Sequence, residues 1–598
     1  MIDTYRMIFQ LLDRRERSRF LMLMMMVLAM SLLDVAGVAS VLPFLAVLAD
    51  PQSVHGSGPI AAVYAWLGFS SERSFLLLLG AVVFFIVVAG LAFKTLTLYA
   101  LTRFSTMRNY TISSRLLHGY MSQPYVWFLS RHSADLGKTV LSEVDQVIGG
   151  CVIPAMTLLA HSTVLVALIT LLMFVDPKTT LIASALLLSS YLTIFVLVRR
   201  LLSRLGKKRV DANLSRYKVA SEALGGIKDV KLLGLERSFL RRFRPPAEVF
   251  ARTQAASRII SGVPRFALEA VAFGGMLIFI LALLAQGDRR LEEIVPILGL
   301  FAFASVRMFP ATQQVYQALT AMRFGRYALA ALHQDYFETG NAQLPEMDIR
   351  PMGLQREIQL QNITYRYPQS ERNALDNMSL VIRAQSTVGL VGGTGAGKTT
   401  AVDVLLGLLR PNTGALLVDG TAITEANLSS WQRAVGYVPQ QIYLTDDTVT
   451  ANIAFGIPPA EVDQDEVERA ASVAGLHRFV ITELPQGYDT MVGERGVRLS
   501  GGQRQRIGIA RALYHDPDVL VLDEATSALD NLTERAVMDA VHNLEGFKTI
   551  ILVAHRLTTV ENCDKIFLID QGAVLAEGHY RELLASSTRF RQMVEAAA

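Results

Sequence analysis

The chain has 598 residues, of which 51% are hydrophobic and 18% charged, a balance that excludes disordered chains, collagen-like fibres and small disulfide-stapled secreted domains. Its formal net charge of +4 at pH 7 is too small to favour nucleic acid as a partner. The two cysteines, Cys151 and Cys563, can build neither a disulfide framework nor a cysteine metal site, so we expect two buried thiols.

Six apolar stretches occupy the first 320 residues, and each is long enough to cross a bilayer as a helix of about 20 residues. They are Phe20–Ala49, Ser74–Leu101, Val147–Val175, Thr179–Val198, Gly262–Gln286 and Ile294–Thr320. Buried helices of a soluble protein are the alternative, but such helices rarely exceed about 20 residues. The sequence therefore predicts a membrane domain of six spanning helices over residues 1–335.

Lys and Arg residues are distributed unevenly among the loops. Five lie in the N-terminal 19 residues, five in Arg103–Lys138 and sixteen in Arg199–Arg258, whereas the other three loops together hold four. The positive-inside rule therefore predicts cytoplasmic termini and two long cytoplasmic loops. Amphipathic patterns in these loops indicate helical stalks, whose tips at Gln123–Arg131 and Lys228–Arg237 are expected to lie against another domain; solvated hairpins are the alternative.

Five charged residues fall inside the predicted spans: Asp34, Lys94, Arg265, Glu269 and Arg307. Each is costly at bilayer depth unless it snorkels, pairs or lines a watery cavity. Arg265 and Glu269 lie one helical turn apart, which allows an intrahelical ion pair. For Arg307 we expect a cavity-facing cation that holds an anionic substrate, whereas the long stem of Lys94 can snorkel.

The predicted outward loop, residues 51–73, contains a short apolar stretch between Gly58 and Phe69. This stretch is too short to span a membrane. It is expected either to lie in the membrane interface as a short helix or to pack as a cap on the bundle.

A polar linker over residues 336–353 separates the spans from residues 354–598, where β-branched runs alternate with helical patterns. This alternation is typical of an α/β domain. The apolar run Ser386–Val391 predicts a buried strand, and Ala401–Leu409 predicts a helix. Between them lies a glycine-rich loop with the pattern G-x-x-x-x-G-K-T.

That loop has the composition of a phosphate-binding loop, because glycines let backbone N–H groups approach phosphate oxygens at a helix N-terminus. Its candidate ATP-binding residues are Gly392, Gly393, Thr394, Gly395, Ala396, Gly397, Lys398, Thr399 and Thr400. Lys398 is expected to neutralise the β- and γ-phosphates. Thr399 is expected to offer its hydroxyl to Mg²⁺.

A second acidic site follows the hydrophobic run Asp518–Asp523. Because side chains alternate along a strand, Asp523 and Glu524 are predicted to point in opposite directions. Asp523 can then join the Mg²⁺ shell, and Glu524 can polarise the water that attacks the γ-phosphate.

The segment Leu499-Ser-Gly-Gly-Gln503, followed by an Arg-rich helical pattern, resembles the signature of ABC ATPases. The resemblance implies that Ser500, Gly501, Gly502 and Gln503 contact ATP bound to a second nucleotide domain. Further family motifs occur in order: Tyr367 resembles the aromatic that stacks on adenine, Gln440 the glutamine that senses Mg²⁺, Glu494 the exporter-type coupling acid, Ser527–Asp530 the D-loop with Asp530, and His555 the switch histidine.

With the six spans ahead of it, the nucleotide domain makes the whole chain similar to an exporter-type ABC half-transporter: a membrane α-helical bundle fused to a cytosolic α/β ATPase domain. The resemblance implies ATP hydrolysis coupled to transport, with ATP and Mg²⁺ as cofactors. Lys398, Gln440, Glu524 and His555 are its implied catalytic residues, and Thr399, Gln440 and Asp523 its metal ligands. Because a signature completes the site of another chain, a homodimer is expected, with a heterodimer as the alternative.

A closer resemblance, to PglK-type flippases of lipid-linked oligosaccharides, lies in four membrane segments. They are Ala39–Phe44, Thr102–Ser105, Val263–Glu269 and Val306–Pro310. This resemblance implies a polyprenyl-pyrophosphate glycan as substrate and a prokaryotic inner membrane as location. Arg265 and Arg307 match the family's cavity arginines; a third basic position is Gly90 here, with Lys94 one turn later.

Two other functions stay open. A multidrug or lipid A exporter would have a largely apolar cavity with few fixed cations, so Arg265 and Arg307 distinguish it from an oligosaccharide flippase. An ATP-gated channel or regulatory scaffold is less favoured, because Glu524 and His555 imply sustained hydrolysis.

Overall fold

The computed structural model describes residues 2–55, 59–69, 71–175, 177–266, 291–340, 349–368, 370–524, 544–554 and 556–597, with the isolated residues 269, 270, 274, 277 and 538. These residues form two compact units. Unit 1 comprises residues 1–123 and 130–344, and unit 2 comprises residues 124–129 and 345–598. Residues 124–129, at the tip of the first predicted cytoplasmic loop, thus belong to the second unit.

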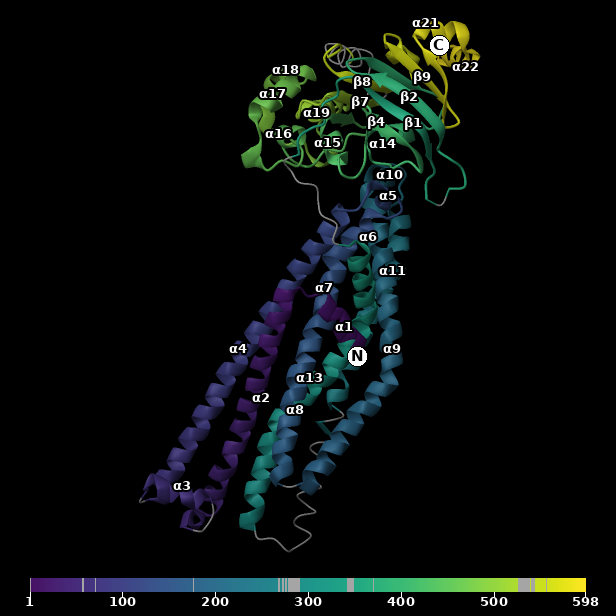
Figure 1. The fold of residues 1–598 in the computed structure, drawn as a ribbon. Helices are drawn as coiled ribbons and strands as arrows, with labels where there is room; N and C mark the ends of the chain where they lie inside the picture. The colour runs from purple at the N-terminus through teal and green to yellow at the C-terminus, as the bar shows by residue number, and fades with distance from the viewer. Residues whose placement is uncertain are drawn as a thin grey trace. The chain divides into compact units, whose positions relative to one another are not determined.

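Unit 1 is a bundle of long helices (Figure 1). Its α-helices are α1 (Ile2–Gln10), α2 (Arg14–Ala49), α3 (Pro59–Leu67), α4 (Glu72–Met121), α6 (Ser133–Lys138), α7 (Val144–Val147), α8 (Ile153–Val175), α9 (Pro177–Gly225), α10 (Ile227–Leu232), α11 (Glu236–Gly262) and α13 (Leu291–Glu338). A 3₁₀ turn, η1 (Pro51–His55), follows α2, and two π-helical segments, η2 (Thr139–Glu143) and η3 (Ile148–Val152), flank α7.

The bundle is held by contacts between long helices: α2 packs on α4 and α8, and α13 packs on α8 and α9. Small residues allow the closest approach. A Cβ atom on Gly206 of α9 would lie 2.0 Å from the carbonyl oxygen of Phe324 on α13. Two backbones therefore touch at a position that only glycine can occupy.

Three helices, among the described residues, are long and apolar enough to cross a membrane: Arg14–Ala49, Glu72–Met121 and Ser133–Val175. They contain the first three predicted spans. The fourth and sixth predicted spans lie within α9 and α13, and most of the fifth, residues 262–286, lies outside the described residues, so the count of six remains a prediction.

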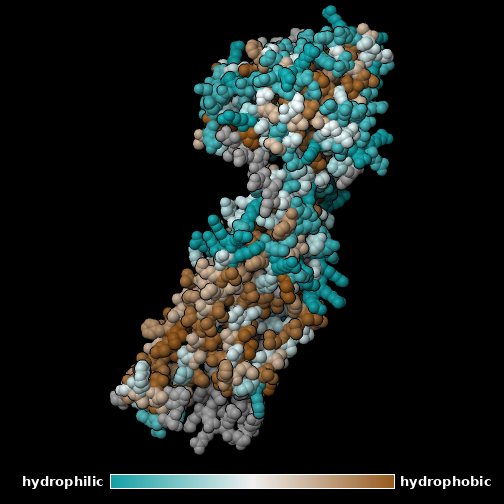
Figure 2. Space-filling view, in the orientation of Figure 1, coloured by the Kyte–Doolittle hydropathy of each residue, from teal (hydrophilic) through white to brown (hydrophobic). Residues whose placement is uncertain are grey.

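The surface of these helices is apolar where a membrane is expected (Figure 2). Leu77 is 76% exposed and Phe174 is 86% exposed. Apolar side chains that face outward along these stretches indicate contact with lipid rather than water.

The predicted outward loop contains the short helix α3. Tyr64 of α3 packs with Phe75 and Val47 at the ends of α4 and α2, whereas Trp66 is 83% exposed. The helix is therefore a cap on the bundle, and one of its faces stays apolar and uncovered.

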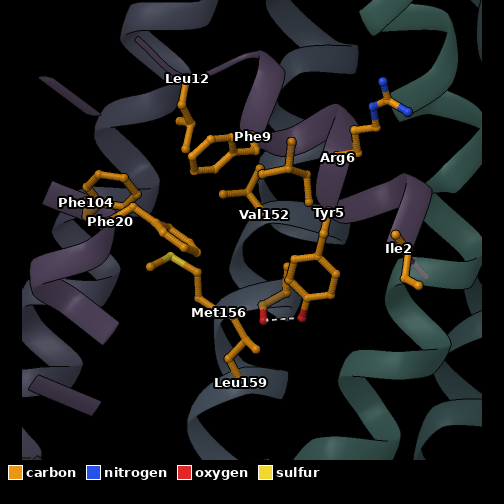
Figure 3. A pocket seen from close by; sticks show the side chains of 12 residues that line it. Ile2, Tyr5, Arg6, Phe9, Leu12, Phe20, Phe104, Val152, Met156 and Leu159 are labelled. Atoms are coloured by element: carbon orange, nitrogen blue, oxygen red, sulfur yellow. Dashed lines mark hydrogen bonds between the residues drawn. The ribbon is translucent and has the colours of Figure 1, made fainter. Parts of the chain in front are cut away.

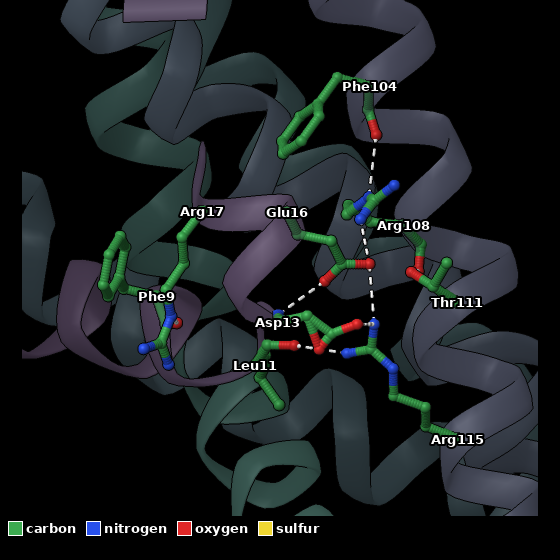
Figure 4. Close-up of polar contacts among 9 residues, drawn as sticks. All are labelled: Phe9, Leu11, Asp13, Glu16, Arg17, Phe104, Arg108, Thr111 and Arg115. Atoms are coloured by element: carbon green, nitrogen blue, oxygen red, sulfur yellow. Dashed lines mark hydrogen bonds and ion pairs between the residues drawn. The ribbon is translucent and has the colours of Figure 1, made fainter. Parts of the chain in front are cut away.

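An ion cluster fixes the turn between α1 and α2 (Figure 4). Glu16 accepts a hydrogen bond from the backbone N–H of Asp13 at 2.9 Å, which closes a capping box at the start of α2. Arg115 of α4 donates to the Asp13 carboxylate at 2.5 Å and to Glu16 at 2.8 Å. Arg108 also pairs with Glu16, and both side chains are buried. The cluster therefore ties the N-terminal turn to α4.

A second buried ion pair joins the π-helical segment η2 to α9. Arg209 donates to the Glu143 carboxylate at 2.5 Å, and Asn213 donates to the other carboxylate oxygen at 2.7 Å. Arg209 is 2% exposed and Glu143 is 4% exposed. The carboxylate thus accepts hydrogen bonds from protein donors at both of its oxygens.

Unit 2 contains two sheets. The antiparallel sheet has the order β2 (Leu375–Arg383), β1 (Glu357–Tyr365), β4 (Thr413–Val418) and β5 (Thr421–Ala422). The six-stranded sheet has the order β10 (Ala573–Gly578), β9 (Lys565–Asp570), β3 (Thr387–Val391), β8 (Thr549–Ala554), β7 (Val519–Asp523) and β6 (Val435–Val438). Strands β9, β3, β8, β7 and β6 are parallel, and β10 is antiparallel to β9.

The strands β3, β7 and β8 are buried along their whole length; the apolar runs of the sequence predicted β3 and β7. The helices of unit 2 are α5 (Tyr125–Leu129), α14 (Lys398–Leu405), α15 (Leu428–Arg433), α16 (Val449–Ile453), α17 (Gln464–Val473), α18 (His477–Glu483), α19 (Gly501–Leu513), α21 (Tyr580–Ser586) and α22 (Thr588–Ala597). Cys151 and Cys563 are both buried and free, which confirms the prediction for the two thiols.

Candidate functional site

The candidate site lies at one edge of the six-stranded sheet. Strands β3, β8, β7 and β6 are neighbours and run parallel, so their carboxyl ends meet at the same edge. The glycine-rich loop follows β3, Asp523 ends β7, and Gln440 follows β6 by two residues. Residues that are far apart in sequence are thereby gathered at one place.

The glycine-rich loop runs from β3 into α14. Gly397, just before α14, has φ +108°, and a Cβ atom there would lie 2.8 Å from the carbonyl oxygen of Ala374, so a side chain is excluded by both conformation and space. The Lys398 ammonium donates to the carbonyl oxygens of Gly392 at 2.8 Å and Gly393 at 3.1 Å. The loop is therefore closed around the lysine that the sequence predicted to meet phosphate.

Lys398 is 5% exposed. Burial lowers the pKa of its ammonium group, while the carboxylates of Glu524 and Asp523 act in the opposite direction. The carboxylates of Glu524 and Asp523 therefore lie near the Lys398 ammonium in a partly desolvated site. Such a site suits a phosphate group with a cation beside it.

Asp523 and Glu524 have different surroundings, although the predicted strand alternation does not apply to the pair, because β7 ends at Asp523. Asp523 is 7% exposed and accepts a hydrogen bond from the Tyr437 hydroxyl at 3.4 Å. Glu524 has φ +49°, its backbone N–H donates to Val553 at 3.0 Å, and its carboxylate accepts a hydrogen bond from the Gln440 amide. The left-handed backbone turns Glu524 out of the strand and towards Gln440.

Asp403 is a site neighbour that was not predicted from the sequence. It lies on α14, and burial together with the negative charge of Asp523 raises its pKa to about 6. The sequence predicted a helix over Ala401–Leu409, but this helical pattern did not indicate that Asp403 belongs to the site. The site therefore contains one more carboxyl group than the motifs suggest.

The raised pKa of Asp403 predicts that the stability of the folded chain depends on pH. An unfolded chain releases this proton near pH 3.8, whereas the folded chain holds it up to about pH 6, so folded stability falls as the pH rises through this window. We expect Asp403→Asn to raise the free energy of unfolding of the nucleotide-free chain at pH 7 by about 1–3 kcal/mol, with a smaller gain at pH 4.5. Thermal unfolding at both pH values measures this, with the exposed Asp446→Asn as control; equal gains at both values would contradict the assignment.

Tyr367, the predicted adenine-stacking residue, lies beside the glycine-rich loop. Its hydroxyl is 3.2 Å from the Thr400 hydroxyl, and its ring meets Tyr365 edge-on with centroids 5.0 Å apart. The aromatic ring is therefore placed next to the helix that begins at the phosphate loop.

The signature residues form the start of α19. Ser500 caps this helix, accepting from the Gln503 N–H at 3.2 Å, and the Gln503 side chain accepts from the Ser500 N–H at 2.8 Å. Helix α19 packs against α16 and α17. Within the described residues, no hydrogen bond joins the signature Ser500–Gln503 to the loop Gly392–Thr400. In the described part of the chain, the signature therefore forms the N-terminus of α19 without a hydrogen bond to the glycine-rich loop of the same chain.

Two predicted site residues, Asp530 of the segment Ser527–Asp530 and His555, lie outside the described residues. Among those described, no group of three or more His, Cys, Asp or Glu side chains could hold a metal ion alone. Thr399, Gln440 and Asp523 supply hydroxyl, amide and carboxylate oxygens, which are the ligands of a hard cation such as Mg²⁺. These three residues would hold a magnesium ion, which would supply positive charge beside the nucleotide phosphates when bound.

The charged residues of the membrane helices are paired with one another. Arg265 donates to Glu269 at 2.6 Å, so the intrahelical pair allowed by the sequence is present. Asp34 is 6% exposed and receives Arg307 at 3.3 Å and Lys94 at 3.8 Å. Both predicted substrate arginines, Arg265 and Arg307, therefore have an acidic partner.

Comparison with known proteins places these features in a family. The family model of the ABC transporter transmembrane region matches residues 21–308, and that of the ABC transporter matches residues 375–527. The chain is 34% identical to an ATP-dependent lipid A-core flippase of Cupriavidus metallidurans, over 79% of this chain and 78% of the relative. It is 31% identical to the heterocyst differentiation ATP-binding protein HepA of a Nostoc species, over 77% of this chain and 74% of the relative.

Among solved structures, a bacterial Atm1-family ABC exporter with ATP bound shares the fold, with a TM-score of 0.78, 24% identity and coverage of 98% of this chain and 99% of that chain. The helical membrane domain fused to an ATPase domain is thus the exporter architecture. The ATPase domain binds ATP with Mg²⁺ and hydrolyses ATP in support of transport. The chain belongs to the ABC transporter family and is a half-transporter of the exporter type.

Proposed function

We propose that the chain forms a homodimer that uses ATP to flip a large anionic glycolipid of the lipid A-core type across the cytoplasmic membrane of a bacterium. Both termini and the ATPase domain are assigned to the cytoplasm. Relatives that bear the name of lipid A-core flippases and match more than three quarters of the chain support this substrate class. The distribution of Lys and Arg supports the orientation.

The observation that carries the substrate proposal is the pairing of the membrane arginines. A polyprenyl-pyrophosphate substrate was expected to use Arg265 and Arg307 as available cations, but each has an acidic partner. A largely apolar cavity with few fixed cations is what the lipid A alternative requires. Asp34, Lys94 and Arg307 together still carry one net positive charge, which favours a phosphorylated head group over a neutral one.

In the proposed ATP site, the loop Gly392–Thr400 holds the phosphates and Tyr367 stacks on the adenine. Thr399, Gln440 and Asp523 surround Mg²⁺. Glu524 orients and deprotonates the attacking water, and the hydrogen bond from Gln440 holds its carboxylate at the site. The residues Ser500, Gly501, Gly502 and Gln503 of the second chain, with Asp530 and His555, complete the site around the γ-phosphate.

The test is flipping in proteoliposomes that contain the full-length chain and a labelled lipid. We expect ATP to move a phosphorylated lipid A-core glycolipid so that an external probe reaches it, and we expect no such movement by Glu524→Gln. A polyprenyl-pyrophosphate oligosaccharide serves as the competing substrate. Flipping of that lipid alone would overturn the proposed substrate and restore the oligosaccharide hypothesis, and flipping of neither lipid during rapid ATP hydrolysis would overturn both.

A further inference from the structure

A cavity of about 530 Å³ lies under the N-terminal helix α1, where α1 meets α2, α4 and α8 (Figure 3). This volume lies in the usual range of small-ligand sites, about 300–1,000 Å³. Apart from Tyr5 and Arg6, every side chain that lines it is apolar. Its lining includes Phe9, Leu12, Phe20, Phe104, Met156 and Leu159.

The polar groups of this cavity are already satisfied or lie at its edge. The Tyr5 hydroxyl donates to the carbonyl oxygen of Ala155 at 2.8 Å, and burial raises the pKa of Tyr5 to about 12. Arg6 is exposed, and its guanidinium points away from the apolar side chains in Figure 3. The interior therefore offers a ligand dispersion contacts and no hydrogen bond that must be met.

The walls of the cavity are held in place by contacts that do not depend on a ligand. The ion cluster of Asp13, Glu16, Arg108 and Arg115 fixes the turn from α1 to α2 (Figure 4). Arg17 donates to the carbonyl oxygen of Phe9 at 3.2 Å and lies over the Phe9 ring at 4.7 Å. Because the turn is fixed in this way, the cavity is preformed, which lowers the cost of binding.

Unpaired positive charge surrounds the same turn. Four exposed arginines make no ion pair with any residue that the structure describes; they are Arg6, Arg14, Arg15 and Arg19. The nearby carboxylates are occupied, since Asp13 and Glu16 pair with arginines of α4 and Asp3 pairs with Arg326 at 3.4 Å. The turn is therefore a basic site immediately before the first membrane helix becomes apolar at Phe20.

We propose that this cavity binds one acyl chain of an anionic phospholipid of the cytoplasmic leaflet. The exposed arginines Arg6, Arg14, Arg15 and Arg19 hold the phosphate of this lipid. An apolar cavity at the membrane interface matches an acyl chain, and exposed arginines match a lipid phosphate. The site lies beside α1 and is separate from the Asp34, Lys94 and Arg307 cluster. It is a resident lipid site, independent of the transported lipid.

Native mass spectrometry of the full-length chain in detergent tests this site, with phosphatidylglycerol and phosphatidylcholine as probes. Leu159→Trp fills the cavity, and Leu98→Trp, at a position of α4 that is 63% exposed, is the matched control. Arg6→Gln with Arg15→Gln removes charge at the turn, and Arg241→Gln with Arg244→Gln, at exposed positions of α11, is its control.

We expect one phosphatidylglycerol per chain that binds at least about tenfold more tightly than phosphatidylcholine. Leu159→Trp should abolish this binding, the arginine pair should lose the preference for the anionic lipid, and both controls should bind as wild type. Retained binding in Leu159→Trp, or equal binding of the two lipids by the wild type, would overturn the proposal.

A second measurement does not depend on the variants folding. Phosphatidylglycerol with a photoreactive acyl chain should label the wild-type chain on α1, at Phe20 or Phe104, or on residues 152–159, and labelling only outside these segments would contradict the site. Neither measurement requires ATP or transport. A failed flipping experiment would therefore leave this site standing, and loss of this site would leave the proposed flippase function standing.

Discussion

Replacement of Glu524 by Gln is expected to lower the rate of ATP hydrolysis by about 100-fold or more, in the range that general-base catalysis contributes. The amide keeps the size of the side chain and its place beside Gln440, but it cannot accept a proton from the attacking water. ATP should still bind, because Lys398 and the glycine-rich loop are unchanged. The variant should therefore accumulate as an ATP-bound dimer with closed nucleotide domains.

Steady-state phosphate release measures the rate, and retention of labelled ATP through gel filtration measures the trapped dimer. Glu461→Gln, at an exposed residue away from the sheet edge, controls for the loss of a carboxylate. Near-normal hydrolysis by Glu524→Gln would show that another group activates the water.

The second large effect is expected at the buried ion pair between Arg209 of α9 and Glu143 of η2. Arg209→Leu leaves the Glu143 carboxylate buried at 4% exposure, with Asn213 as its remaining donor. Removing one partner of such a pair costs about 3–5 kcal/mol, because the other charge stays desolvated. We therefore expect a large fall in the stability of unit 1 with the ATPase site itself intact.

The double variant Arg209→Leu with Glu143→Leu distinguishes the buried charge from lost packing. Replacing both partners removes the uncompensated charge, so most of the stability should return. Thermal unfolding of the two variants and wild type in the same detergent measures this. If the double variant were as unstable as Arg209→Leu alone, lost packing and not the charge would explain the effect.

Much of the ATP site could be predicted from the sequence because its determinants are local. A buried strand that ends in a glycine-rich loop and a helix is one continuous segment, and the structure places β3, Gly397 and α14 in that order. The Arg265 and Glu269 pair is local in the same sense, since one turn of helix joins its members. Both could be read without knowledge of the tertiary structure.

The features missed from the sequence depend on tertiary contacts. Asp34 and Arg307 are 273 residues apart, and only the packing of α2 on α13 brings their side chains together. The hydrogen bond of Tyr437 to Asp523 likewise follows from the pairing of β6 with β7. Asp403 was missed because its raised pKa comes first from burial and then from the charge of Asp523, and both depend on the tertiary fold.

Helix α5 interrupts the sequence of unit 1 but belongs to unit 2. Val126 packs against the same apolar core as Tyr367 and Tyr437, and Tyr125 lies close enough to Asp403 and Tyr367 for their charges to act on it. Six residues encoded in the middle of the membrane half therefore complete the surface of the catalytic half. A fragment that starts at residue 345 would therefore carry every residue of the proposed ATP site and still lack six residues that pack in its own unit.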